Sequence, residues 1–113
     1  MPPRDWQLRV EDILDAATTI ETYIADLTFE QFKTDRKTVD AVVRNLEVIG
    51  EAAKHLIAVQ DDLPGDIPWA DIAGMRNILI HEYFGVDLGI VWQTATGDVP
   101  LLRAKLQPLL NPD

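Results

Sequence analysis

The chain contains no cysteine, so it has neither a disulfide framework nor a thiolate for catalysis or metal binding. Its apolar runs are all shorter than a membrane-spanning helix. The first residues, 1–6, lack the apolar core of a signal peptide. We therefore expect a cytoplasmic protein that does not enter a membrane.

Blocks of basic residues are also missing. The 113 residues include 19 acidic and 10 basic side chains, which gives a net charge of −9, and the acids are spread along the chain. A field of this sign repels phosphates and argues against a high-affinity nucleic-acid binder that ignores sequence. A local site built around one arginine can still bind a phosphate, because close charge-assisted pairs act at short range.

Several motifs that carry chemistry are absent as well. There is no Gly-rich phosphate loop, no paired-carboxylate constellation and no zinc-ligand spacing. The two histidines, His55 and His81, are far apart in sequence and have no clustered acid, so we expect no metal centre. His55 follows Lys54 on a polar flank, and we interpret it as a surface histidine.

No stretch alternates apolar and polar residues with a period of two, so we expect no sheet. Instead, apolar residues recur every three or four positions, which is typical of helices packed on a core. The clearest stretches are residues 4–26 and 34–60, followed by a third helix that begins at Trp69. The sequence predicts one all-α domain over residues 1–113, an up-and-down bundle of four or five helices.

Local signals refine this plan. Residues 28–32 look like a helical turn in a connection that is too short to be a core element. Residues 97–100 are expected to interrupt the last helical stretch, with Pro100 in the first turn of a final helix. Helix-capping residues are expected at Thr28, with Gln31 in the capping-box position, at residues 34–35, and at Asp87.

Two glycines lie inside expected helices. Gly50 sits at the edge of the apolar face of the second helix, where glycine costs about 1 kcal/mol relative to alanine. We interpret it as a point of close approach between helices, and we interpret Gly74 in the third helix in the same way.

Charged residues of alternating sign line the flank beside Gly50. Arg44, Glu47 and Glu51 follow one another at spacings of three and four, so they share one side of the helix. Two interpretations remain open. The three residues form a solvated ion-pair face, or one of them holds Arg76 in place.

The segment from Arg76 to Tyr83 places an arginine, a histidine and a tyrosine among isoleucines and leucines. Polar groups with such neighbours are either paired or kept for chemistry. On a continuous helix Arg76 and Tyr83 share a ridge, whereas Arg76 and His81 point about 140° apart. Two arrangements unite them: a helix that ends near Ile80 and turns His81 inward, or a second copy of the chain across a two-fold axis.

These residues match a known pattern. Arg76-x4-His81-x-Tyr83, with Asn77 after the arginine, resembles the signature of HEPN domains and, more closely, of HepT-like toxins. The runs at residues 44–54, 69–77 and 86–92 resemble the same family. The resemblance extends in order over nearly the whole chain.

The resemblance implies a dimeric helical bundle that acts as a metal-independent endoribonuclease, without a cofactor, in a type VII toxin–antitoxin pair. Arg76 and His81 would be catalytic, with Asn77 and Glu51 supporting them. Tyr83 would accept AMP from the antitoxin, a minimal nucleotidyltransferase, and so silence the enzyme. The partners would be a second copy, that antitoxin and RNA, but neither DNA nor a membrane.

The residue types suit this chemistry. An imidazole can accept the proton of a ribose 2′-hydroxyl or protonate the leaving oxygen, and a guanidinium can neutralise the charge that builds on the phosphate. The alternative is a catalytically inert, dimeric interaction module that only binds a nucleotidyltransferase. In that case the Arg–His–Tyr cluster would be a satisfied network at an interface.

Overall fold

The structure is a computed structural model that describes residues 5–63, 65–81 and 87–110; for residues 5 and 77–81 it describes the backbone alone. No strand occurs in these ranges, so the predicted all-α class is confirmed. None of the helices seen there combines the length and the apolar character that a membrane crossing requires. The helices are α1 (Asp5–Ile24), α2 (Phe29–Lys33), α3 (Arg36–Ile57), α4 (Trp69–His81), α5 (Leu88–Gln93) and α6 (Val99–Leu110), with a 3₁₀ turn at Gln60–Asp62 and a π-helical segment at Thr94–Asp98.

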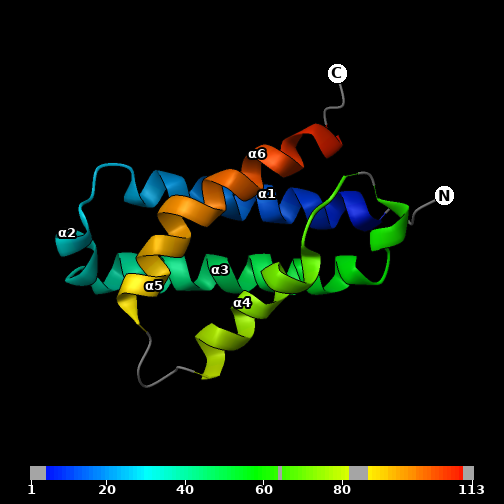
Figure 1. Cartoon of the computed structure of the whole chain (residues 1–113). Coiled ribbons are helices and arrows are strands. Elements are labelled where there is room, and N and C mark those ends of the chain that lie inside the picture. The colour runs from blue at the N-terminus through cyan, green and yellow to red at the C-terminus, as the bar shows by residue number, and fades with distance from the viewer. Residues whose placement is uncertain (1–4, 64, 82–86, 111–113) are drawn as a thin grey trace.

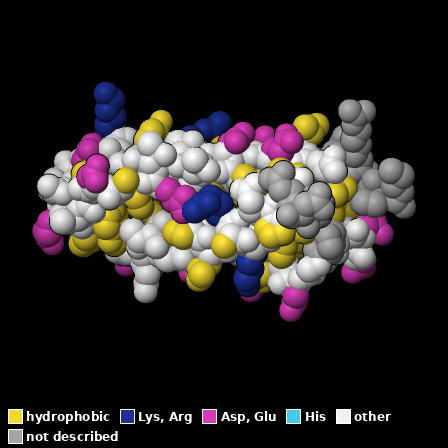
Figure 2. Space-filling model, turned by 90° about the horizontal axis from the view of Figure 1, so that it is seen from above, with side chains coloured by type: hydrophobic (Ala, Val, Ile, Leu, Met, Phe, Trp, Pro, Cys, Tyr) yellow, Lys and Arg dark blue, Asp and Glu magenta, His cyan; other side chains and the backbone are white. Residues whose placement is uncertain are grey.

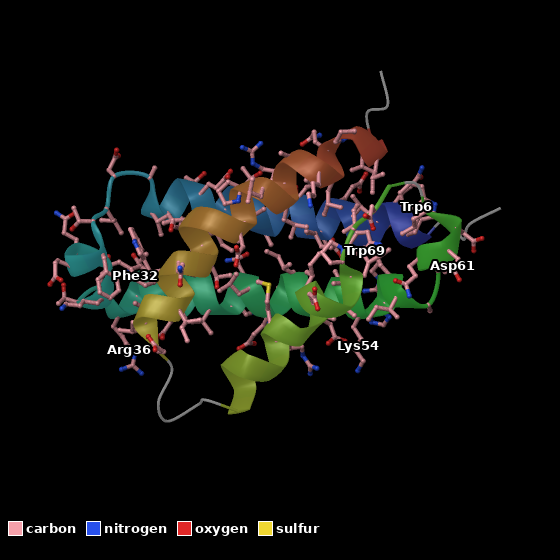
Figure 3. The ribbon with its side chains drawn as sticks, in the orientation of Figure 1. Trp6, Phe32, Arg36, Lys54, Asp61 and Trp69 are labelled. Carbon is pink, nitrogen blue, oxygen red and sulfur yellow. The ribbon has the colours of Figure 1, made fainter. Side chains whose placement is uncertain are left out.

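The two long helices α1 and α3 form the centre of the bundle (Figure 1). α6 packs along α1, and α4 packs against the other side of α3, so that its C-terminal half diverges from the bundle. Trp6 and Trp69 lie toward one end of the molecule and Phe32 at the other (Figure 3). The apolar stripes of α1, α3 and α6 meet in one core, whose fully buried members include Val10, Ile13, Ile20, Val42, Leu46, Ile49, Leu56, Val99 and Leu106.

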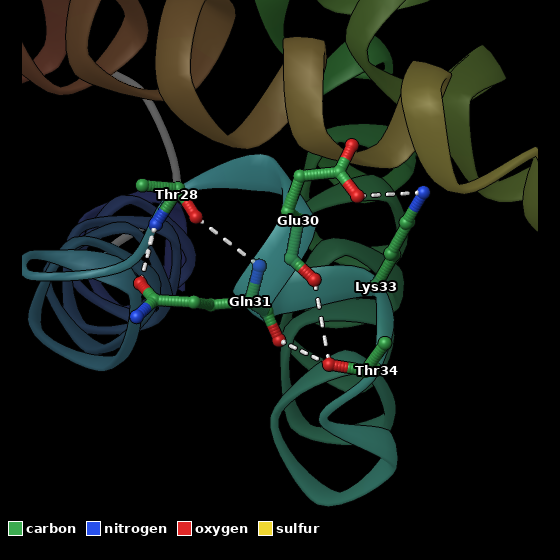
Figure 4. Close-up of polar contacts among 5 residues, drawn as sticks. All are labelled: Thr28, Glu30, Gln31, Lys33 and Thr34. Carbon is green, nitrogen blue, oxygen red and sulfur yellow. Dashed lines mark hydrogen bonds and ion pairs between the residues drawn. The ribbon is translucent and has the colours of Figure 1, made fainter.

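The connection after α1 is capped as predicted. The Thr28 hydroxyl accepts a hydrogen bond from the backbone N–H of Gln31, and the Gln31 side chain accepts one from the backbone N–H of Thr28 (Figure 4). The prediction that this turn is too short to join the core is wrong. Phe32 is fully buried, with its ring centroid 5.0 Å from that of Trp92. One aromatic side chain, rather than helix length, fixes the turn to the core.

α3 begins one residue after its cap, Asp35, whose carboxylate accepts hydrogen bonds from the hydroxyl and the backbone N–H of Thr38. These two bonds, the hydroxyl's first, lower the pKa of the Asp35 carboxyl below its ordinary value. The helix ends at Ile57, three residues before the predicted end, because the chain tightens there toward the 3₁₀ turn.

The structure of residues 87–110 confirms one prediction and contradicts another. Asp87 caps α5 as expected, through the backbone N–H groups of Gly89 and Ile90. Residues 97–100, however, do not interrupt the helix. The chain winds from α5 through the π-helical segment directly into α6. In the π-helical segment the backbone N–H of Val99 donates to the carbonyl of Thr94, and this shifted hydrogen-bond register accommodates Pro100, which has no N–H to donate.

The two interior glycines behave differently. A Cβ built on Gly50 would lie 2.7 Å from the Cβ of Arg76 and 3.2 Å from its backbone nitrogen, so α3 and α4 cross at this glycine. The predicted close approach at Gly50 is therefore confirmed. The same prediction for Gly74 is wrong, because a Cβ there would have nothing within 4 Å.

This contrast predicts opposite effects for two identical substitutions. Gly50→Ala should lower the free energy of unfolding by about 1 kcal/mol or more, because the overlap outweighs the gain in helix propensity. Gly74→Ala should raise it by about 0.5–1 kcal/mol, because only the propensity gain applies. Urea unfolding followed by circular dichroism measures both. Equal effects of the two changes would show that α3 and α4 do not cross at Gly50.

Candidate functional site

α4 carries the candidate site residues. Its backbone is helical from Trp69 through His81, so Arg76, Asn77 and His81 all belong to it. The side chains of Asn77 and His81 are outside the described part of the structure, and Tyr83 lies outside the described residues altogether. Arg76 is therefore the residue of the motif whose surroundings the structure gives.

Arg76 is held by Glu51. The Nε atom of Arg76 lies 3.2 Å from Oε2 of Glu51, and the two side chains are 35% and 45% exposed. The pair forms where α3 and α4 cross, since Glu51 follows Gly50 directly. Of the two interpretations of the charged flank, the one in which a member holds Arg76 is therefore correct for Glu51.

The other interpretation, a solvated ion-pair face, is wrong for Arg44 and Glu47. Neither takes part in an ion pair within the described ranges. Both side chains border a cleft instead.

Glu51 has a second neighbour. Its Oε1 atom lies 3.5 Å from Nε2 of His55, one helical turn further along α3. His55 is exposed, as predicted for a surface histidine, but its contact with Glu51 was not anticipated. The four-residue spacing was the available signal. The Glu51 carboxylate thus has Arg76 on one oxygen and His55 on the other.

Arg76 keeps its hydrogen-bonding capacity. Its contact with Glu51 is an ion pair that is not aligned as a hydrogen bond, and it forms no hydrogen bond with any other residue that the structure describes. A guanidinium presents five N–H donors in a planar fork that fits two oxygens of a phosphate. Arg76 is therefore positioned by one carboxylate and still able to bind an anion.

A cleft of about 340 Å³ opens beside Arg76, between α1, α3 and α4. Three basic side chains line it, namely Arg9, Arg44 and Arg76, together with three acidic ones, namely Asp12, Glu47 and Glu51. Sequence reasoning missed Arg9 and Asp12, because nothing in a polar flank of α1 indicates which helix it faces. Elsewhere charges are also mixed: the face on the side of α6 shows acidic and basic groups interspersed, without an extended basic area (Figure 2).

The described residues contain no group of three His, Asp or Glu side chains arranged to hold a metal ion. The acids of the cleft stand beside arginines instead. Its guanidinium groups can bind an anion, and one of them, that of Arg76, is oriented by Glu51.

The model of the "Ribonuclease HepT-like" family matches residues 13–109. A protein of Thermococcus cleftensis named "Probable ribonuclease HepT" is 44% identical over 100 residues, which cover 88% of this chain and 91% of that protein. A relative from Caldanaerobacter subterraneus, whose name begins "Putative RNase", is 38% identical over 102 residues, or 90% of this chain and 91% of its own. No solved structure matches the chain significantly.

One relative has a different size. The Methanocaldococcus jannaschii protein named "Gamma-glutamylcyclotransferase and putative RNase" is 38% identical over 108 residues. The match covers 96% of this chain but 49% of that protein. This chain thus spans about half the length of that relative.

Proposed function

The chain belongs to the HepT-like family of the HEPN superfamily, and we propose that it is a metal-independent endoribonuclease with Arg76 and His81 as its catalytic residues. The main support for this function is the environment of the Arg76 guanidinium. Its guanidinium is paired with Glu51 and borders an open cleft, and no residue that the structure describes accepts a hydrogen bond from it, which leaves its donors available to a phosphate there. The names of the relatives support RNA as the substrate.

The proposed reaction uses the nucleophile that RNA carries. The ribose 2′-oxygen attacks the adjacent phosphorus, the bond from phosphorus to the 5′-oxygen breaks, and a 2′,3′-cyclic phosphate remains. The imidazole of His81 takes the proton from the 2′-hydroxyl or gives one to the leaving 5′-oxygen. Arg76 stabilises the negative charge that builds on the phosphate oxygens, and Asn77 orients the imidazole or binds the same phosphate.

Glu51 is proposed as a positioning residue. Arg76 has a flexible side chain, and a guanidinium that is already oriented loses less entropy when it meets the transition state. The half-exposed ion pair adds little to the stability of the fold, because solvent screens it. Its contribution is therefore to the geometry of the site.

The test is cleavage of a labelled RNA in the presence of EDTA. Loss of one positioned acid or base typically costs ~10²–10⁴-fold in rate, so His81→Ala should nearly abolish cleavage while the fold survives. Arg76→Ala should have an effect of similar size. Arg36→Ala is the matched control, because Arg36 is 90% exposed and lies at the far end of α3 (Figure 3). If neither site variant reduces the activity, the site is elsewhere or the activity is a contaminant.

Glu51→Gln extends this test. It should lower kcat by less than either catalytic variant and change the free energy of unfolding by no more than about 1 kcal/mol. If instead the wild-type chain cuts no RNA but forms a stable complex with a nucleotidyltransferase, the chain is an interaction module.

We also propose that the active form is a homodimer. The backbone is helical through His81, which leaves Arg76 and His81 about 140° apart on one helix. α4 is the outermost helix of the bundle and packs mainly on α3 (Figure 1). A second copy packed on α4 would bring a second motif to the site.

The dimer is expected at micromolar concentration, and light scattering of the purified protein measures it. The specific activity should fall on dilution below the dissociation constant, because the separated protomers each lack half of the site. A monomer that remains fully active at every concentration would contradict the dimeric site.

The last proposed element is the control of activity. Tyr83 lies two residues beyond His81, and a phenolic oxygen projects far enough from the backbone to enter the cleft of another enzyme. We propose that a partner nucleotidyltransferase, the antitoxin of a type VII pair, transfers AMP from ATP to this oxygen and releases pyrophosphate. The added phosphate brings negative charge and bulk near Arg76, and both keep an RNA phosphate out.

Mass spectrometry tests this directly. Incubation with the partner, ATP and Mg²⁺ should add one AMP to Tyr83, and the modified protein should no longer cut RNA. Tyr83→Phe should not be modified, whereas Tyr23→Phe, which removes the other tyrosine from the exposed surface of α1, should be modified as fully as the wild type. AMP on a different residue would show that this switch is wrong.

A further inference from the structure

We propose that Arg9 and Arg44 bind phosphates next to the one at Arg76, so that the cleft between α1, α3 and α4 is a track for single-stranded RNA. The proposal rests on the proposed ribonuclease function and extends it to the way the substrate is held. It assigns a role to two arginines that lie outside the Arg–His motif.

Arg9 and Arg44 are both available to bind a phosphate. Each lines the cleft that Arg76 borders, and neither forms an ion pair or a hydrogen bond with a residue that the structure describes. Asp12 and Glu47 follow these arginines by three residues, yet neither acid forms an ion pair with the arginine before it.

Arg44 and Arg9 are placed to reach other phosphates than Arg76 does. Arg76 is fixed beside Glu51, and Arg44 lies seven residues before Glu51 on the same helix. Seven residues of α-helix span about 10 Å, or two turns. The backbone of Arg44 is therefore about two helical turns from Glu51, which holds Arg76, and this spacing suits successive groups of one strand better than a single small anion. Arg9 adds a third charge from α1 on the opposite border of the cleft.

Val48 and Ala52 also line the cleft. Val48 is half-buried and Ala52 is buried, so apolar groups lie among the charged ones. Such a surface suits the sugar and the base face of a single strand, whose phosphates then lie toward the arginines. A duplex is too wide and stiff for a cleft of about 340 Å³.

The acids of the cleft should affect RNA binding in the opposite direction to its arginines. Asp12 and Glu47 border the same track and repel phosphates at short range, so the cleft holds RNA weakly despite three arginines. Neutralising an acid should therefore strengthen binding, while neutralising an arginine should weaken it. Opposite effects of this kind do not arise from a loss of folding.

The experiment measures binding of a short, single-stranded RNA with 2′-O-methyl groups, which lacks the nucleophile and cannot be cut. Fluorescence anisotropy at several salt concentrations gives the dissociation constant and its salt slope. Arg9→Ala and Arg44→Ala should each weaken binding two- to fivefold, as expected for exposed charge pairs. Each should also reduce the salt slope by about 0.7, the value for one lost phosphate contact on a single strand. Glu47→Gln should strengthen binding.

Two controls separate the track from net charge alone. Arg36→Ala removes the same charge from the far end of α3, and Glu30→Gln removes an acid from α2, outside the cleft. Both should leave the salt slope unchanged. If Arg9→Ala and Arg44→Ala behave like Arg36→Ala, the track does not exist.

Cleavage of the unmodified RNA is measured in parallel, so that the two proposals fail separately. Wild-type cleavage with no specific effect of Arg9 or Arg44 on binding would overturn the track and leave the ribonuclease function standing. Specific binding effects without any cleavage would overturn the ribonuclease function and leave the track as an RNA-binding surface. Absence of both binding and cleavage would overturn both.

Discussion

The absence of a side chain at Gly50 determines where the functional groups of this protein can lie. Only a glycine lets the backbone of Arg76 come within 3.2 Å of the position that a Cβ would occupy on α3. Because Glu51 is the next residue, the same crossing places a carboxylate against the guanidinium. The cleft beside it is then bordered by α1 on its far side, since α1 and α3 are packed along their lengths. The absence of a Cβ atom at Gly50 thus determines the positions of Arg76, Glu51 and the adjacent cleft.

A net charge of −9 is unusual in a chain that belongs to a ribonuclease family, and the proposed RNA track accounts for it. Charges separated by more than about 8 Å are largely screened at physiological ionic strength. The acids spread over the surface would therefore oppose RNA only weakly once it is near the cleft. In the proposed track, the arginines of the cleft would act at the short distances where screening matters least. Recognition of this kind depends on few contacts, which makes each of them individually measurable.

The sequence was sufficient for the parts of the fold that depend on local rules. Helical periodicity predicted the all-α class, and side-chain chemistry predicted the caps at Thr28, Asp35 and Asp87. It was insufficient where the outcome depends on what lies opposite a residue. Gly50 and Gly74 look alike in sequence, yet one faces a backbone and the other faces open space. Phe32 was assigned to a connection, although a single aromatic ring is enough to reach the core.

The same limit applies to the candidate site. The motif on α4 and the charged flank of α3 are each a local run that the sequence displays, so their association was open to prediction as one of two alternatives. Arg9 enters the cleft from a helix about 35 residues before Arg44, and no local pattern connects the two. The π-helical segment also escaped prediction, because glycine and proline normally end a helix, whereas here the proline falls in a position that tolerates it.

The packing of α6 along α1 has a consequence for how the protein is made. α1, which borders the cleft, is supported by α6, which is synthesised after α1 to α5, through core residues such as Leu106 and an ionic contact of 2.7 Å between Arg103 and Glu21. Contacts between segments so distant in sequence form late in folding. While α6 is still inside the exit tunnel, α1 has no partner on that side. The nascent chain therefore lacks a closed core, and with it a rigid cleft, until α6 has emerged.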